Sequence, residues 1–412
     1  MINISFNQAY DIVVNNILPL PDETVSVEKS LRRATSQDII SLIDSPSADV
    51  SLKDGYAVIS EEIDNASPEN PVFLDLIGSQ FAGGEDSDNL RVTKGKAVKI
   101  TSGAVIPSGV DGVLANEFAE ESNNRVKTLA TVGNNILRKG TDISKGEVVV
   151  PKSTTLMPTQ IGLIAAAGHS QIKVYKKPRV AIIATGDEIV EVGKPVEDGK
   201  IAASNIATLA AWCNYFNMDS STIVVADSTE AITQAAQQAL AVSDCIITSG
   251  GAWRSERDFV VKVFEKIGWV RMFYRVKIGP GKAVAFGLLE GKPIFCLPGG
   301  PPSNQMAFLQ LALPGLRCLG GHKEHTLPVV TAVLEKEVSG QKDWTQFEMG
   351  FFRKNNNSLM FTPKKLPSRL QSLSTAEGII TIPEGTKTIP ANSKVDIQVL
   401  AEPSSVFIKE WV

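Results

Sequence analysis

The sequence predicts a multidomain α/β plus β protein, with a mostly parallel α/β sheet lying between two modules built from strands. Short apolar strands alternate with helices between residues 179 and 276, a pattern that is typical of βαβ units. Short β-rich runs separated by turn residues fill residues 56–150, and strand-like runs return after residue 329. The 412 residues are enough for several domains, each with its own core.

Composition and charge exclude several classes of protein. Lys and Arg number 41 and Asp and Glu 45, a net charge of −4, which argues against nucleic acid as a partner. The four cysteines are widely spaced and only three histidines occur, which disfavours a zinc site or a redox dithiol. Cys245 and Cys296 lie in apolar runs and are expected to be buried free thiols. His322 and His325 are expected at the solvated surface. No apolar run approaches the roughly 20 residues of a membrane span and no cleavable signal peptide is recognised, so we expect a cytoplasmic protein without a membrane partner.

The N-terminal part of the chain contains the first strand-built module and its helical flanks. The stretch to about residue 43 is predicted to be helical, because apolar residues recur at near-helical spacing at Ala9, Ile12, Val13, Ile17 and Leu18. Ser45-Pro46-Ser47 breaks this pattern. Strand-like runs follow at residues 72–77, 96–100, 126–132 and 147–150, and a helix is expected over residues 159–167, closed by Gly168.

The α/β segment and the last module follow. Strands are predicted at residues 179–184, 222–226, 244–248 and 269–276, with helices at 204–216, 229–242 and 259–266. In such sheets ligands bind beyond the carboxyl ends of the parallel strands. Strand-like runs at residues 329–338, 347–352, 378–382 and 394–400 predict a second β module, which we expect to be a barrel.

Glycine-rich clusters lie at the ends of the predicted strands: Ser249-Gly250-Gly251, Gly279-Pro280-Gly281-Lys282 and Pro298-Gly299-Gly300-Pro301-Pro302-Ser303. Glycine lets backbone N–H groups approach an anion, Lys282 would add a positive charge, and Ser303 is expected to cap a helix that begins near residue 304. Any one cluster alone is more simply a turn, but all of them at one sheet favour an anion pocket. The sequence contains neither a Walker A pattern nor a G-x-G-x-x-G fingerprint, which disfavours a P-loop or a dinucleotide-binding domain.

Acidic residues accompany these clusters. Asp187, Glu188 and Asp227 follow strands, and carboxylates beside a phosphate cradle suit a hydrated Mg²⁺. Asp227 and Asp258 could equally be helix N-caps. Asp54 and Asp142 could be ordinary turn residues.

The order of these motifs resembles the MoeA family, which comprises molybdopterin molybdenumtransferases and the E domain of gephyrin. The resemblance runs from near residue 5 to the end of the chain and rests on seven motifs: Asp54-Gly55-Tyr56-Ala57, Gly140-x-Asp142-Ile143, Thr185-Gly186-Asp187-Glu188, Ser204-Asn205, Ser249-Gly250-Gly251 with Asp258, Pro280-Gly281-Lys282 and Leu297-Pro298-Gly299. It implies a connecting domain at residues 1–43 and 145–176, an inserted β domain at 44–144, a MogA-like α/β pterin-binding domain at 177–325 and a C-terminal β barrel at 326–412.

The resemblance also implies a function. Members of the family insert molybdate or tungstate into adenylated molybdopterin with Mg²⁺ and release AMP, and they act as homodimers. By this resemblance a MogA-like adenylyltransferase and molybdoenzyme acceptors are expected as protein partners. The alternatives are a non-catalytic molybdopterin-binding or handover paralogue and, with less support, a nucleotide pyrophosphatase.

Site residues are carried over from the same motifs. The resemblance assigns catalysis to Asp54, Asp142, Glu188, Asp227 and Asp258, with Asp54 and Asp142 reaching in from the partner subunit. It assigns the metal to Asp187, Glu188 and Asp227. It assigns substrate binding to Thr185, Gly186, Ser249, Gly250, Gly251, Arg254, Lys277, Gly281, Lys282, Pro298, Gly299, Gly300 and Ser303.

The sequence departs from the family pattern at Trp253, at Gly279 and at Gly300, where a side-chain amide is lost. Arg254 is hypothesised to replace the charge missing at Gly279. These departures motivate the non-catalytic alternative.

Overall fold

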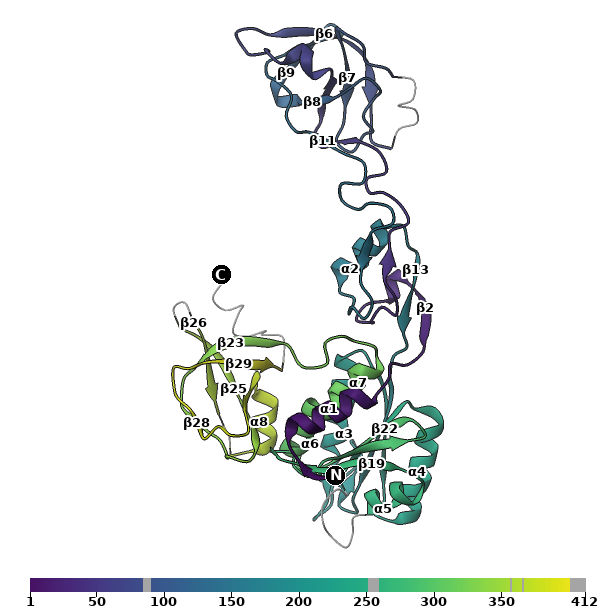
Figure 1. The fold of residues 1–412 in the computed structure, drawn as a ribbon, viewed down its shortest axis with the longest axis vertical. Coiled ribbons are helices and arrows are strands. Elements are labelled where there is room, and N and C mark those ends of the chain that lie inside the picture. Colours follow the sequence, from purple (N-terminus) through teal and green to yellow (C-terminus); the bar gives the residue numbers. More distant parts are fainter. Residues whose placement is uncertain (84–89, 251–258, 356–357, 365–366, 401–412) are drawn as a thin grey trace.

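The computed structural model describes residues 1–83, 90–250, 259–355, 358–364 and 367–400. Figure 1 shows an elongated molecule with a β domain at one end, a slender connecting part, and an α/β domain at the other end with a small barrel beside it. Within these ranges no helix has the length and apolar character needed to cross a membrane.

The N-terminal segment packs on the α/β domain. Strand β1 (Ile2–Ile4) pairs in parallel with β19 (Val270–Val276), and helix α1 (Phe6–Asn16) contacts α7 (Leu313–Leu319). The prediction of helix as far as residue 43 is wrong beyond Asn16, because Pro19 and Pro21 cannot continue a helix. Strand β2 (Asp22–Ser26) follows and pairs with β13 (Gln171–Tyr175). The predicted domain boundaries stay predictions, but residues 2–16 belong by packing with the α/β sheet.

The β domain is carried on two antiparallel segments. Strand β3 (Ile39–Ile40) pairs with β12 (Val148–Val150), and β4 (Val50–Ser51) pairs with β11 (Ile136–Leu137), while α2 (Pro158–Ala166) lies at the base. Beyond them a six-stranded sheet surrounds a core that includes Tyr56 and Leu114. Its strands, in spatial order, are β8 (Gly112–Ala115), β5 (Gly55–Val58), β7 (Lys96–Ile100), β6 (Val72–Gln80), β10 (Arg125–Thr128) and β9 (Ala119–Ser122).

The α/β domain contains a seven-stranded sheet. Its spatial order is β1, β19, β21 (Ala285–Leu289), β22 (Lys292–Leu297), β18 (Cys245–Ser249), β14 (Arg179–Thr185) and β17 (Asp219–Val225). Only β21 runs antiparallel to its neighbours, which confirms the mostly parallel sheet. Two apolar clusters cover it, one involving α1, α3 (Ser204–Tyr215) and α7, the other α4 (Thr229–Val242) and α5 (Phe259–Lys266). All four cysteines are buried free thiols, which confirms the expectation for Cys245 and Cys296.

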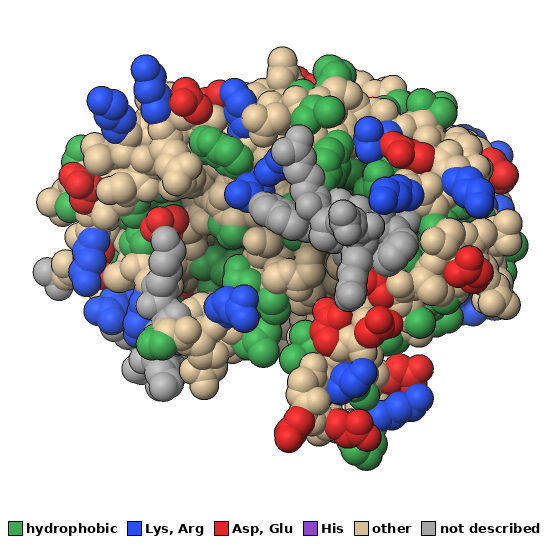
Figure 2. All heavy atoms as spheres, turned by 90° about the horizontal axis from the view of Figure 1, so that it is seen from below, with side chains coloured by type: hydrophobic (Ala, Val, Ile, Leu, Met, Phe, Trp, Pro, Cys, Tyr) green, Lys and Arg blue, Asp and Glu red, His purple; other side chains and the backbone are tan. Residues whose placement is uncertain are grey.

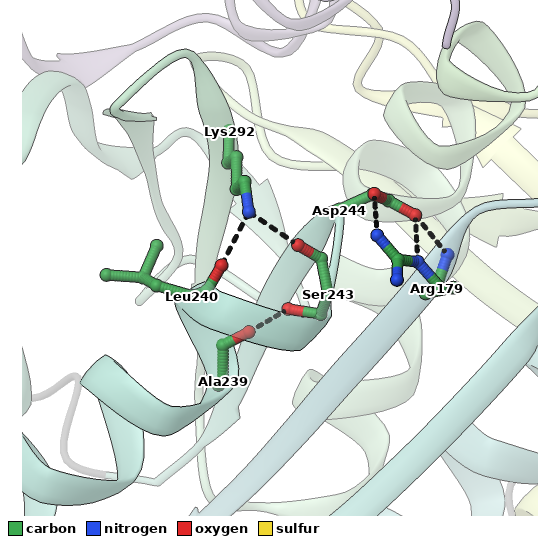
Figure 3. Close-up of polar contacts among 6 residues, drawn as sticks. All are labelled: Arg179, Ala239, Leu240, Ser243, Asp244 and Lys292. Carbon is green, nitrogen blue, oxygen red and sulfur yellow. Dashed lines mark hydrogen bonds and ion pairs between the residues drawn. The ribbon is translucent and has the colours of Figure 1, made fainter. Parts of the chain in front are cut away.

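Polar contacts align the amino-terminal ends of the central strands (Figure 3). The Arg179 guanidinium donates to both carboxylate oxygens of Asp244, at 3.0 and 2.8 Å. Lys292 Nζ donates to the carbonyl oxygens of Leu240 and Ser243 at the end of α4, where a positive charge offsets the helix dipole. Burial alone would raise the pKa of the Asp244 carboxyl, but hydrogen bonds from Arg179 hold it below its ordinary value. These contacts at the amino-terminal ends help to fix the register of the same strands at their carboxyl ends.

Lys292→Met is expected to lower the free energy of unfolding by about 1–2 kcal/mol, because it leaves two carbonyl groups at the end of α4 without their charged donor. Denaturant unfolding followed by circular dichroism measures the change. The control is Lys336→Met, which removes an exposed lysine from the barrel. Equal losses in the two variants would contradict the capping role.

The C-terminal module is a closed barrel, as expected. Strands β25 (Thr345–Asn355), β26 (Ser358–Pro363), β23 (Val329–Leu334), β29 (Lys394–Val399) and β27 (Gly378–Ile382) pair in this order, and β27 pairs again with β25. The predicted strand at residues 329–338 ends early, at Leu334. Helix α8 (Arg369–Thr375) contacts α6 (Pro301–Ala307) of the α/β domain. Strand β20 (Ile278–Gly279) also joins the two domains by pairing with β25.

Candidate active site

The carboxyl ends of four parallel strands meet at one edge of the α/β sheet. Thr185 of β14 is in register with Val225 of β17, and Ser249 of β18 is in register with Leu297 of β22. The segments that follow these strands contain eight of the predicted site residues: Gly186, Asp187, Glu188, Asp227, Gly250, Pro298, Gly299 and Gly300. On the face seen from below, acidic and basic side chains are interspersed, with hydrophobic side chains between them (Figure 2).

Gly250 brings the backbones of three strand ends into close contact. Its φ is +101°, and a Cβ at this position would lie 2.7 Å from the carbonyl oxygen of Thr185. Its N–H donates to the Leu297 carbonyl at 3.1 Å, and its Cα lies 3.7 Å from a Cβ placed on Gly299. Only glycine fits such a position without strain, so the cluster is a compact backbone cradle.

Ser249 lies at the centre of this cradle, with 5% of its surface exposed. The Asn205 amide, on α3, donates to Ser249 Oγ at 3.1 Å and to the Gly299 carbonyl at 2.8 Å. The Asn304 amide, on α6, donates to Ser249 Oγ at 3.1 Å and to the Pro298 carbonyl at 2.9 Å. The sequence did not identify Asn304 as a site residue; its nearest signal was the proline-glycine cluster just before it.

A second polar group faces the same strand ends. Thr185 is 4% exposed, and among the described residues its Oγ1 has no hydrogen-bond partner. Buried polar atoms are nearly always paired in folded proteins, so an orphaned hydroxyl beside a cradle indicates a place for a ligand.

The acidic residues are brought together in part. Asp187 Oδ1 accepts a hydrogen bond from the Asp227 N–H at 3.1 Å, so these two strand ends lie against each other. A Cβ placed on Gly186 would lie 2.7 Å from Glu188 Oε2, so the Glu188 carboxylate folds back over Gly186. The N-cap alternative for Asp227 is wrong, because Ser228 caps α4 by accepting from the N–H of residue 231.

These carboxylates suit a Mg²⁺ ion that is held largely by phosphate and water. In the part of the chain that the structure describes, no three His, Cys, Asp or Glu side chains gather as a metal-binding group. Mg²⁺ commonly keeps several waters and takes one or two protein carboxylates together with substrate phosphates. The oxygen donors of Asp187, Glu188 and Asp227 therefore fit the ion, and a preformed protein cage is not needed.

The second glycine loop packs beside the cradle. Gly281 is buried with φ +117°, and a Cβ there would lie 3.4 Å from the Ser303 carbonyl, so the loop lies against the first turn of α6 with exposed Lys282 next to it. The capping role predicted for Ser303 is wrong: α6 begins at Pro301, and Gly300 occupies the N-cap position. Lys277 lies at the junction with the barrel, where its Nζ is 3.6 Å from Glu384 Oε1.

Asp54 and Asp142 are not brought to this site within one subunit. Asp54 directly precedes β5 of the β domain, and Asp142 lies between β11 and β12 in the stalk; both parts extend away from the α/β domain in Figure 1. Asp54 Oδ1 accepts from the Ser102 N–H at 2.7 Å, within the β domain. The predicted site residues Gly251, Arg254 and Asp258, and the departure at Trp253, lie outside the described residues.

A cavity of 760 Å³ lies elsewhere, where the connecting part, the α/β domain and the barrel meet. Its lining includes Tyr215 at the end of α3, whereas Asn205 at the start of that helix holds Ser249. Ten residues of helix separate the two by about 15 Å. The cavity is therefore distinct from the strand-end site.

The fold and this edge define a multidomain α/β protein with a glycine-lined polar cradle at the carboxyl ends of its parallel strands. Comparison with known proteins adds detail. Residues 4–168 match a model of the MoeA N-terminal region (domain I and II), residues 181–317 a probable molybdopterin binding domain, and residues 331–400 the MoeA C-terminal region (domain IV).

A molybdopterin molybdenumtransferase of Haemophilus influenzae is 34% identical over 346 residues, which cover 81% of this chain and 83% of that protein. One of Staphylococcus aureus is 27% identical over 399 residues, covering 96% and 95%. The crystal structure of a molybdopterin biosynthesis MoeA protein from Pyrococcus horikoshii is 26% identical, with a TM-score of 0.82 over 97% of this chain and 100% of that one. The chain belongs to the MoeA family of molybdenum cofactor biosynthesis, and the predicted fold class is confirmed.

Proposed function

We propose that this chain is a molybdopterin molybdenumtransferase, which inserts molybdate or tungstate into adenylated molybdopterin and releases AMP. The observation that carries the proposal is the Ser249 cradle, because it presents a hydroxyl group, held by two amides, at the strand ends where α/β proteins bind anionic ligands. The names of the relatives support the transferase class.

In the proposed reaction the chain positions a substrate that already carries its own reactive groups. Release of AMP breaks a bond at phosphorus, so positioning and charge stabilisation can supply most of the catalysis. Ser249 and Thr185 offer hydroxyl groups to the substrate, and Lys282 offers a positive charge. Asp187, Glu188 and Asp227 would hold Mg²⁺, which when bound neutralises charge on phosphate oxygens. The dithiolene sulfurs belong to the substrate, which agrees with four buried thiols in the enzyme.

The proposal extends to the assembly. Asp54 and Asp142 would act in the site of the other subunit of a homodimer, because the β domain and the stalk that contain them extend away from the α/β domain of their own chain (Figure 1). We place the protein in the cytoplasm, with a MogA-like adenylyltransferase supplying its substrate and molybdoenzymes receiving the product.

Glu188→Gln is expected to lower the rate of AMP release at least tenfold, while affinity for adenylated molybdopterin changes little, because the substitution removes a charge that the metal needs and leaves the cradle intact. The assay is reconstitution with adenylated molybdopterin, Mg²⁺ and either molybdate or tungstate, scored by AMP. The control is Glu191→Gln, on the same exposed segment.

An unchanged rate in Glu188→Gln would contradict the assigned role. Wild-type protein that binds the substrate without ever releasing AMP would overturn the transferase proposal in favour of cofactor handover. Turnover of ordinary dinucleotides would indicate a pyrophosphatase.

A further inference from the structure

The two amides that meet at Ser249 have fixed orientations. An amide group can be turned so that either its oxygen or its nitrogen faces a neighbour, and the surrounding hydrogen bonds decide which. Asn205 faces the Gly299 carbonyl at 2.8 Å and Asn304 faces the Pro298 carbonyl at 2.9 Å. A carbonyl oxygen can only accept, so each amide must present its NH₂ group on that side. The same two nitrogens lie 3.1 Å from Ser249 Oγ.

This arrangement determines what the Ser249 hydroxyl can do. A serine oxygen has two lone pairs and one hydrogen. Both amides donate to it, so both lone pairs are occupied and the hydrogen is left to donate elsewhere. Within the described ranges no acceptor for this hydrogen occurs, although the side chain is only 5% exposed.

We infer that Ser249 is an obligate hydrogen-bond donor to the bound substrate, and that Asn205 and Asn304 are positioning residues that impose this role. The inference rests on the proposed function and deepens it, because it states which chemistry the substrate must present at this point: an acceptor oxygen, on a phosphate or on the ring carbonyl of the pterin. A ligand with an N–H group at the same place would meet a second donor and bind poorly.

Gly300 lacks the side-chain amide that the family pattern has at this position. The positioning role of Asn304 explains how the cradle is ordered without it. Residue 304 is one helical turn further along the same helix, and its amide reaches both the Pro298 carbonyl and Ser249. The amide that orders the cradle is thus supplied from within α6.

A double-substitution cycle tests the inference. Affinity for adenylated molybdopterin is measured without molybdate in wild type, Ser249→Ala, Asn304→Leu and the double variant. Ser249→Ala is expected to weaken binding about tenfold to a hundredfold, since it removes a hydrogen bond to a charged or strongly polar group. Asn304→Leu is expected to weaken it severalfold, because the hydroxyl is then free to turn away. The double variant should bind like Ser249→Ala, since Asn304 acts through Ser249.

Two further probes distinguish the sources of the acceptor oxygen. AMP offers phosphate oxygens without a pterin, and a phosphate-free pterin offers the ring carbonyl alone; the probe whose binding Ser249→Ala weakens identifies the acceptor. Asn205→Leu is the matching variant on α3 and should also act through Ser249; Asn214→Leu, at an exposed position of the same helix, is its control.

The inference is overturned if Ser249→Ala binds all three probes as tightly as wild type. It is also overturned if Asn304→Leu weakens binding by the same factor in the wild-type and in the Ser249→Ala background. That result would indicate that Asn304 only supports the loop at Pro298. Failure of the proposed function gives a different result: wild-type protein would then not bind adenylated molybdopterin, or would bind it without releasing AMP.

Discussion

Gly250→Ala is expected to lower the free energy of unfolding by about 3 kcal/mol and to abolish AMP release in the reconstituted reaction. The φ of +101° is unfavourable for any residue with a Cβ, and the added carbon would lie 2.7 Å from the Thr185 carbonyl oxygen, a backbone atom that cannot move alone. The strand ends of β14 and β18 would have to separate, which would displace Ser249 from its two amides. Denaturant unfolding and the AMP assay measure the two effects.

Gly291→Ala separates the two causes of this loss. Gly291 lies in the same domain with φ +78°, and a Cβ there would meet no atom within 4 Å. Its substitution should cost about 1 kcal/mol, the part that comes from backbone conformation alone. If Gly250→Ala were no more harmful than Gly291→Ala, the close approach of the strand ends would not constrain the site.

The second large effect concerns pH. Burial, with the nearby positive charge of Arg317, lowers the pKa of His322 to about 3, and its ring Nδ1 lies 2.7 Å from Thr155 Oγ1. In the unfolded chain this imidazole would titrate near pH 6.5. The unfolded state therefore binds one more proton than the folded state between about pH 6.5 and pH 3. Stability is lost as the pH falls through this window, by about 2 kcal/mol between pH 7.5 and pH 5.

His322→Gln should remove this part of the pH dependence. Unfolding free energies at pH 5 and pH 7.5 measure it, and the difference between the two should shrink by about 2 kcal/mol relative to wild type. His169→Gln, at another of the three histidines, is the control and should keep the wild-type difference. If the unfolding free energies of His322→Gln at pH 5 and pH 7.5 differed as much as those of wild type, this imidazole would not be held neutral by burial.

The same histidine shows why the sequence misled at this point. A loop with two histidines, a lysine and a glutamate is usually solvated, and His322 was expected there. The structure buries it to 8% exposure, and its ring Nδ1 contacts Thr155 of the connecting part, 167 residues earlier in the chain. Contacts over such separations have no local signal.

Local patterns predicted the α/β domain well. The helices at residues 229–242 and 259–266 were predicted with their observed bounds, because each has a clear apolar face. The N-terminal helix was extended too far, because its apolar spacing was followed across Pro19. The strand ends that form the cradle were predictable too, because each apolar run that indicates a strand is followed by glycine, which marks its end.

The finer arrangement of the site could not be predicted in this way. Asn304 lies 55 residues from Ser249, and only the packing of α6 against the strand ends brings its amide to the hydroxyl. Likewise nothing local indicates that Ser228, rather than Asp227, caps α4, since both residues favour that position. Side-chain roles of this kind depend on how the elements pack.

The stalk of the β domain has a mechanical consequence. Its outgoing and returning segments are tied to each other by the β3–β12 and β4–β11 pairs, so the arm resists twisting, and one cut peptide bond in it would leave the domain attached. Because the domain lies at the end of a long arm, a small change of angle at the base, near β2 and β13, displaces the far end by a much larger distance. In the proposed homodimer, the angle at that base would therefore set where Asp54 and Asp142 lie relative to the site of the other subunit.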